Sequence, residues 1–94
     1  MNVVRSFTLS KDKELCEKTI PKDARILSVC VIKENIRIFF KEDVNAHYIK
    51  TDKQKVEFAV FKDGRQFYID DYEFLGTVVL DFGNSIYHVF YRNV

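Results

Sequence analysis

Apolar and polar residues alternate along much of this chain with a period of two, which is the pattern of half-buried β-strands. Residues 3–9 alternate in this way, and the charged residues 11–13 end the run. Residues 14–20 are more sparsely apolar, and Pro21 would stop a helix here, so a short edge strand rich in Lys and Glu is predicted instead. The beginning of the chain therefore predicts two strands joined by a charged turn.

The segment ARILSVCVIKENIRIFF, residues 24–40, predicts a hairpin. Its turn is expected at residues 33–35, where Asn35 is able to adopt a left-handed conformation. Both faces of this hairpin are largely apolar, and in its second strand Arg37, Phe39 and Lys41 alternate with the apolar residues. The expected faces of the first strand are Ile26, Ser28, Cys30 and Ile32 on one side and Leu27, Val29 and Val31 on the other.

Two further hairpins are predicted after a long polar stretch at residues 41–55, a length typical of a functional or mobile connection. The segment VEFAVFKDGRQFYI turns at Asp63-Gly64, and EFLGTVVLDFGNSIYHVFYR turns at Gly83-Asn84, both favourable pairs for two-residue turns. The expected cross-strand pairs are Phe61–Gln66, Ala59–Tyr68, Leu80–Tyr87, Val79–His88 and Val78–Val89. The expected faces of the last hairpin are Phe74, Val78 and Leu80 on one side and Leu75, Val79, His88 and Phe90 on the other.

These patterns predict an all-β fold for residues 1–94. We expect a single domain, a small antiparallel sandwich or barrel of seven or eight short strands built from consecutive hairpins. Because several strands are apolar on both faces, the second face needs cover, either from a closed barrel or from a second copy of the chain. A homo-oligomer is therefore predicted.

Composition and charge narrow the function classes. Apolar residues make up 47% of the 94 residues, which excludes disorder, and the net charge of +1 disfavours a surface that tracks duplex DNA. No apolar run reaches the roughly 18 to 20 residues that a membrane helix needs, and the N-terminal segment lacks the apolar core of a signal peptide. We therefore expect a cytoplasmic protein without a membrane or duplex DNA as partner.

Metal and cofactor chemistry has little support in the sequence. His47 and His88 lie far apart without ligands at metal-binding spacing, so neither a metal site nor a cofactor is predicted. Cys16 and Cys30 fit reduced thiols. If a tight connection at residues 21–23 folds the flanking segments together, the two cysteines lie nearly opposite each other, and a disulfide is geometrically conceivable.

Some acidic and histidine side chains are candidates for either a catalytic or a structural role. Asp70, Asp71 and Glu73 form an acidic cluster that is able to supply paired carboxylates, but adjacent aspartates in a link between strands more often cap turns. His88 is interpreted as a hydrogen-bonded histidine of the core or of an interface. We therefore predict a binding protein without enzymatic activity.

The sequence offers more candidate residues for ligand binding than for metal binding or catalysis. Arginine grips phosphate in bidentate fashion, and aromatic rings offer faces on which a base stacks. The alternative is that the same aromatic residues belong to the core and the same cations are only solvated. The candidate ligand-binding residues are Arg37, Lys50 and Arg65 for phosphate, Tyr48 and Tyr68 for stacking, and His47 beside them.

Three segments resemble a family of small phage-encoded β proteins of unknown function. They are IPKDARILSVCV (residues 20–31), FLGTVVL (74–80) and IYHVFY (86–91), and the family pattern reads LPxGAKILSV, YIGTV and HVF in the same order. This chain departs from the pattern in having Asp23 in place of Gly and a longer polar insert. The resemblance implies a phage or prophage origin. The expected location of the protein is therefore the cytoplasm of an infected bacterium.

The resemblance also implies an expected role, by analogy with small phage proteins that disarm host defences. The first hypothesis is sequestration of a small nucleotide immune signal in pockets of a homo-oligomer. The alternative is a protein-blocking or assembly module that contacts a host or virion protein through an exposed β face, with Phe39, Phe61 and Tyr91 as anchors.

Overall fold

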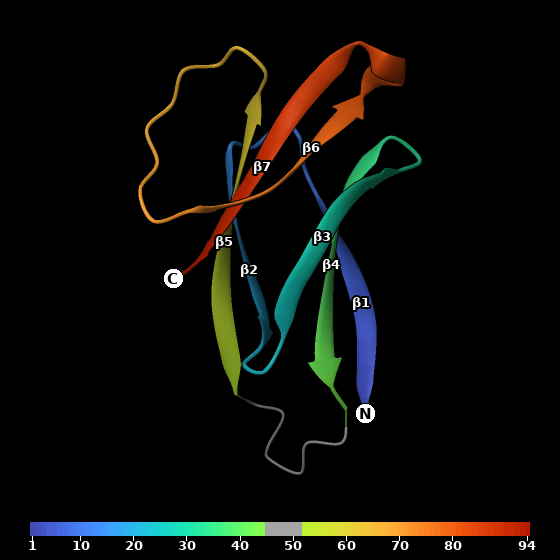
Figure 1. The fold of residues 1–94 in the computed structure, drawn as a ribbon, viewed down its shortest axis with the longest axis vertical. Helices are drawn as coiled ribbons and strands as arrows, with labels where there is room; N and C mark the ends of the chain where they lie inside the picture. Colours follow the sequence, from blue (N-terminus) through green and yellow to red (C-terminus); the bar gives the residue numbers. More distant parts are fainter. Residues whose placement is uncertain (45–51) are drawn as a thin grey trace.

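A computed structural model describes residues 1–44 and 52–94. Two antiparallel sheets, one of three strands and one of four, pack face to face (Figure 1). The all-β prediction is confirmed, and no helix in the described ranges has the length and hydropathy to cross a membrane. The elements are β1 (Asn2–Leu9), β2 (Leu15–Pro21), β3 (Arg25–Ile32), β4 (Asn35–Asp43), β5 (Lys53–Lys62), β6 (Glu73–Leu80), the 3-10 turn η1 (Asp81–Gly83) and β7 (Ser85–Asn93).

The three-stranded sheet has the order β1-β4-β3, and the four-stranded sheet has the order β2-β5-β7-β6. The strands predicted at residues 3–9 and 14–20 are confirmed as β1 and β2, and β2 is an edge strand as expected. Because β2 and β3 belong to different sheets, the segments that flank residues 21–23 do not pair. The expected opposition of Cys16 and Cys30 is therefore wrong, and both are free thiols.

The core lies between the inward faces of the two sheets. Phe58 of β5 is fully buried, and its ring meets that of Phe7 on β1 edge-on, with the centroids 5.5 Å apart. Each such apolar side chain contributes roughly 1.5 to 3 kcal/mol by its burial. The buried cluster consists of Leu9, Ile20, Ala24, Ile36, Ile38, Phe40, Val56, Phe58, Val60, Val78, Leu80 and Val89.

Two β-bulges change which face some side chains occupy. The register of β3 shifts between Ile26 and Ser28, and that of β6 shifts between Phe74 and Gly76. An extra residue in a strand inverts the alternation beyond it. Ile26 and Leu75 therefore lie with the inward residues, and Phe74 lies opposite Phe90 on the outer face, so the faces predicted for these three residues are wrong.

The tight turns also differ in detail from the predictions. Leu80 lies opposite Ser85, so residues 81–84 form a four-residue connection and the predicted pairing with Tyr87 is wrong by two positions. A shift of two positions keeps the same residues on the same face. Between β3 and β4 the turn consists of Lys33 and Glu34 alone, with φ angles of 50° and 63°.

The hairpin predicted around Asp63-Gly64 does not form. The turn itself is present, since the N–H of Arg65 donates to the carbonyl of Lys62 at 2.9 Å. Residues 65–72 then leave the sheet and cross β7 to reach β6 (Figure 1). The reason is that β7 occupies the free edge of β5 along its whole second half, so Ala59 lies opposite Phe90 and not Tyr68.

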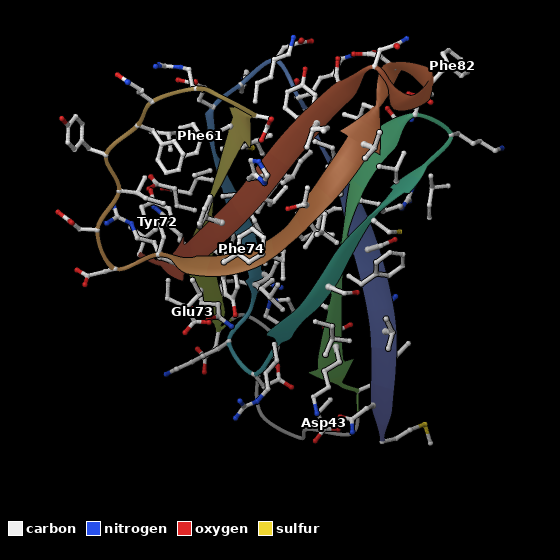
Figure 2. The ribbon with its side chains drawn as sticks, turned by 45° about the horizontal axis from the view of Figure 1, so that its top comes forward. Asp43, Phe61, Tyr72, Glu73, Phe74 and Phe82 are labelled. Carbon is white, nitrogen blue, oxygen red and sulfur yellow. The ribbon has the colours of Figure 1, made fainter. Side chains whose placement is uncertain are left out.

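This crossing loop covers part of the outer face of the four-stranded sheet (Figure 2). The ring of Phe67 stacks on that of Phe61 with the centroids 3.9 Å apart, leaving Phe61 only 5% exposed. The Tyr72 hydroxyl donates to Glu57, and the Arg92 guanidinium lies 4.6 Å from the centre of the Tyr72 ring. Burial, followed by the hydrogen bond to Glu57, raises the pKa of Tyr72. The chain itself thus covers part of the outer face, which the apolar pattern predicts to be covered by a barrel or by a second copy.

Candidate functional site

The outer face of the three-stranded sheet carries an unusual set of charges. Directly opposed residues of antiparallel strands share a face, so the register defines rows of neighbouring side chains. Three successive rows form a surface that we name the basic face, because each of its formal charges is positive. The rows are Val4–Lys41–Arg25, Ser6–Phe39–Ser28 and Thr8–Arg37–Cys30.

The cations of the basic face lack partners of opposite charge. Within residues 1–44 and 52–94, Arg25, Arg37 and Lys41 form no ion pair. The first carboxylate on this face belongs to Asp43, one row beyond Lys41, and its Oδ1 lies 3.4 Å from the N-terminal ammonium. Arg25 and Lys41 lie directly opposite each other, and like charges in that position are destabilising. An anion bound between them would remove the repulsion.

Phe39 lies at the centre of the basic face. It is partly exposed, and its cross-strand neighbours Ser6 and Ser28 are small. No ring in the described part of the chain stacks on Phe39. Arg37 is held in place by a hydrogen bond of 3.0 Å from its Nε to Ser6 Oγ. An aromatic ring with cations two residues away on either side is thus available to a ligand.

A hollow of about 670 Å³ adjoins one end of the basic face. Lys22 lines it together with Arg25 and Lys41. Two carboxylates also line it, those of Asp23 and Glu73, and each already accepts a hydrogen bond of 2.8 Å. The hollow therefore extends the positive charge around the end of the sheet.

The structure separates the predicted site residues. Arg37 lies on the basic face, whereas Arg65 and Tyr68 lie in the loop that crosses the other sheet. His47, Tyr48 and Lys50 fall within residues 45–51, outside the described ranges. The structure therefore brings Arg65 and Tyr68 together but does not bring Arg37 to them.

The surroundings of Arg65 are acidic. Its guanidinium makes two hydrogen bonds to Glu14, of 2.7 and 3.1 Å, and these bonds raise the pKa of Arg65. An open hollow of about 760 Å³ lies beside it, and the fully exposed Tyr68 is part of its lining. The charged residues of this hollow are Glu14, Glu57 and Asp70 against Arg65 and Arg92.

The exposed aromatic residues are not all those expected from the sequence. Phe61 lies beneath Phe67, and Tyr91 packs against the core while its hydroxyl donates to Glu73 at 2.8 Å. Their prediction as exposed anchors is therefore wrong. Among the described residues, Tyr68 is fully exposed, and Phe82 and Phe74 are 90% and 58% exposed (Figure 2).

A polar row crosses the four-stranded sheet on its outer face. Thr77 Oγ1 lies 2.9 Å from His88 Nδ1, and His88 Nε2 lies 2.8 Å from a carboxylate oxygen of Asp63. A hydroxyl, an imidazole and a carboxylate in this order also occur in nucleophilic catalysis. Here the row joins three neighbouring strands or their ends, and Thr77 and His88 belong to the GTV and HVF segments. We interpret these hydrogen bonds as contacts that fix the register of β5, β6 and β7.

The acidic cluster at residues 70–73 spans the end of the crossing loop and the first residue of β6. Asp71 has a φ of 61°, typical of a turn, and the carbonyl of Asp70 accepts a hydrogen bond of 3.4 Å from Arg92. Glu73 accepts the hydrogen bond from Tyr91. None of these contacts joins one of the three carboxylates to another.

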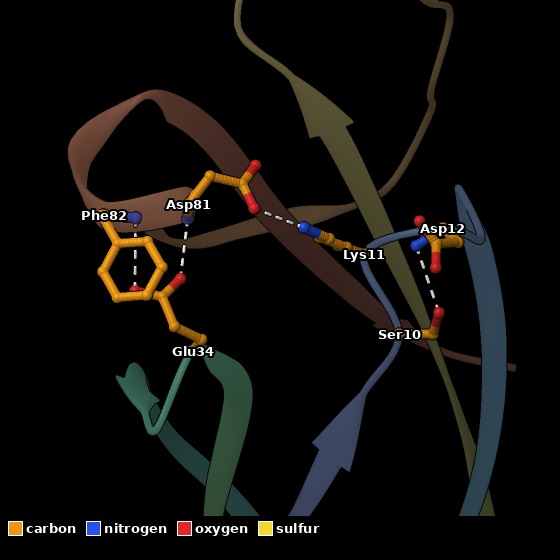
Figure 3. A network of polar contacts seen from close by, with 6 residues as sticks. All are labelled: Ser10, Lys11, Asp12, Glu34, Asp81 and Phe82. Carbon is orange, nitrogen blue, oxygen red and sulfur yellow. Dashed lines mark hydrogen bonds and ion pairs between the residues drawn. The ribbon is translucent and has the colours of Figure 1, made fainter.

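Three connections meet at one end of the sandwich (Figure 3). The carboxylate of Glu34 accepts hydrogen bonds from the backbone N–H groups of Asp81 and Phe82, at 2.7 and 3.3 Å. Lys11 reaches Asp81 from a third connection, with Nζ 2.6 Å from Oδ1. Glu34, Asp81 and Phe82 all have positive φ angles, a conformation that costs about 1 to 2 kcal/mol per residue. No local pattern predicts this contact, because its partners are 47 residues apart.

Acid should loosen this end of the molecule. Hydrogen bonds from Lys11 and then from Ser85 lower the pKa of Asp81. A carboxyl group whose pKa is lower in the folded chain stabilises the fold above its unfolded pKa, and this contribution is lost as the pH falls through the folded value. We expect the unfolding midpoint of the native chain to fall more than that of Asp81→Asn between pH 5 and about pH 2. Denaturant titrations at several pH values measure the difference, and parallel curves would contradict it.

No group of three or more His, Cys, Asp or Glu side chains able to hold a metal occurs in the described ranges. The family model of the Domain of unknown function (DUF7352) matches residues 1–94. The chain belongs to this family. Neither the curated proteins nor the solved structures contain a match.

Proposed function

We propose that this DUF7352 member is a non-enzymatic binding protein that holds a phosphorylated nucleotide on its basic face. The observation that supports the proposal is the set of three cations around Phe39, with no carboxylate in their rows. The Arg25–Lys41 pair offers two adjacent cations for a phosphate group. Phe39 offers a ring for the base.

The hollow beside Arg65 and Tyr68 supports an anionic ligand less well. Both of its arginines are already paired with carboxylates, Arg65 with Glu14 and Arg92 with Glu57 at 3.2 Å. A phosphate group would have to displace these carboxylates and would meet their negative charge. The basic face imposes no such competition.

The wider form of this proposal is sequestration of a nucleotide immune signal in the cytoplasm of an infected bacterium. That form is supported only by the resemblance to phage proteins. Because the three cations and Phe39 belong to one chain, binding on the basic face does not require an oligomer.

A thermal-shift titration tests the proposal, with cyclic dinucleotides, cyclic trinucleotides and ADP-ribose as probes. At a concentration of 100 times Kd, a ligand specific for the folded chain adds about 2.7 kcal/mol. For a domain of this size, that corresponds to a rise in Tm of roughly 10 °C or more. We expect such a rise for at least one phosphorylated nucleotide and for none of the unphosphorylated nucleosides.

The variant Arg25→Ala/Lys41→Ala should fold normally and lose the shift. Lys55→Ala is the matched control, because it removes a cation from the other sheet, where Lys55 lies 3.7 Å from Glu17. The proposal fails if neither a nucleotide nor an oligonucleotide binds the native chain, or if the double variant keeps full binding.

A second candidate function, contact with another protein, is favoured by an apolar strip on the outer face of β6 and β7. Phe74, Val79 and Ile86 are 58%, 48% and 39% exposed, and Val79 lies directly opposite Ile86. A second copy of the chain or a host protein would bury this strip. The molar mass in solution shows whether a second copy buries the strip. We expect a dimer or larger oligomer, which the substitution Val79→Lys should dissociate. A native chain that is monomeric at micromolar concentration would contradict this expectation.

A further inference from the structure

We infer that the ligand of the basic face is a single-stranded nucleic acid that lies along β4, with one base on Phe39 and its flanking phosphates at Arg37 and at the Arg25–Lys41 pair. This inference depends on the proposed function, because it assigns a ligand class to the same site. It adds that the ligand is a polymer and that it is unpaired.

The spacing of the cations indicates a polymer. Arg37 and Lys41 are four residues apart on β4, so their Cα atoms are about 13 Å apart along an extended strand. One phosphate group is too small to contact both side chains across Phe39 while a base lies on the ring. Two phosphates on either side of one nucleotide satisfy both cations, and a single strand of nucleic acid offers this arrangement at each of its internal nucleotides.

The charge continues beyond these three residues. Arg25 lies directly opposite Lys41, and Lys22 follows in the hollow of about 670 Å³ that both of them line. The cations therefore follow one another from Arg37 to Lys22 around the end of the sheet, and the two carboxylates that line the same hollow, those of Asp23 and Glu73, each accept a hydrogen bond from the chain. A path of this kind suits a flexible polyanion, whereas a single nucleotide would leave most of it unused.

The ring at the centre selects an unpaired strand. Stacking on an aromatic side chain needs a base whose face is free, which a duplex does not offer. The small neighbours Ser6 and Ser28 leave room around Phe39 for such a base. The net charge of +1 is also low for a protein that tracks duplex phosphates.

Fluorescence anisotropy with a labelled twelve-nucleotide oligothymidylate tests the inference on the full chain. We expect binding that weakens with salt, with a slope of log Kobs against log salt of about −2, since each phosphate contact in a single strand contributes about −0.7. The duplex of the same length should bind at least about ten-fold more weakly, and thymidine monophosphate should compete only at far higher concentration.

Three variants assign the contacts. Phe39→Leu keeps an apolar side chain but removes the ring, and should weaken binding about ten-fold without changing the salt slope. Arg37→Ala should weaken binding and reduce the slope by about 0.7. Lys55→Ala on the other sheet should leave both unchanged. Circular dichroism and Tm of each variant establish that it is folded.

The outcomes separate this inference from the proposed function. If thymidine monophosphate competes as well as the oligonucleotide, the site takes a single nucleotide, and the inference fails while the proposed function stands. If the duplex binds as tightly, or if Phe39→Leu binds normally, a base does not stack on the ring and the inference fails. If neither oligonucleotide nor nucleotide binds, both are wrong.

Discussion

Phe58→Ala is expected to remove most of the stability of this protein. Phe58 is fully buried between the two sheets and contacts the ring of Phe7 across the core. Truncation of a buried Phe to Ala costs about 3 to 5 kcal/mol, out of the roughly 5 to 15 kcal/mol that stabilise a typical domain. For a chain of this length, Tm should fall by more than about 12 °C. Thermal or denaturant unfolding followed by circular dichroism measures the change.

Phe74→Ala is the matched control, because it removes the same side chain from an exposed position. Phe74 is 58% exposed, and its ring contact is with Phe90, with the centroids 5.3 Å apart. Its loss should cost no more than about 1 kcal/mol. Equal losses for the two variants would show that the core does not lie where the structure places it.

Gly76→Ala is expected to destabilise the protein by about 1 to 3 kcal/mol, the usual cost of overpacking. A Cβ built on Gly76 would lie 2.8 Å from Cγ1 of Val29, so β6 and β3 approach each other too closely there for any larger residue. The sign of the effect is informative. In a strand without this contact, Ala in place of Gly would stabilise by roughly 0.5 to 1 kcal/mol.

Val29→Ala provides the rescue that identifies the cause. It removes the atom that the new Cβ would meet, at the expense of some apolar burial of its own. In the Val29→Ala background, Gly76→Ala should therefore be neutral or slightly stabilising, giving a coupling energy of about 1 kcal/mol or more in the double-mutant cycle. Additive losses would refute the proposed contact. The measurement is the denaturant midpoint of the four proteins.

Gly76, Thr77 and His88 lie within the FLGTVVL and IYHVFY segments, and each has a contact with a structural role. Gly76 is the glycine of the FLGTVVL segment, and its place against Val29 gives a packing reason for that residue. Thr77 and His88, from two of those segments, contact each other at 2.9 Å across β6 and β7. These residues of the FLGTVVL and IYHVFY segments thus have structural roles, whereas the three cations of the basic face lie outside both segments.

Local patterns were sufficient for seven strands and for part of the candidate site, but they wrongly predicted a further strand after Asp63-Gly64. The alternation of residues 36–41 already placed Arg37, Phe39 and Lys41 on one face of a strand, because the side-chain period of a strand is a local property of its backbone. The alternation does not show that Arg25 lies beside Lys41. That depends on the register of β3 and β4, which includes a bulge.

The sequence by itself determined an all-β chain, the approximate positions of its seven strands and the sites of its tight turns, since these follow from short-range periodicity and turn chemistry. Only the tertiary structure decided which strand takes the edge of β5, which loop covers the outer face, and that Glu34 binds the turn at residues 81–82. These features depend on competition among distant segments for the same edges, faces and backbone donors. The outcome of this competition depends on the free energy of the whole fold. It cannot be predicted from a short segment of neighbouring residues.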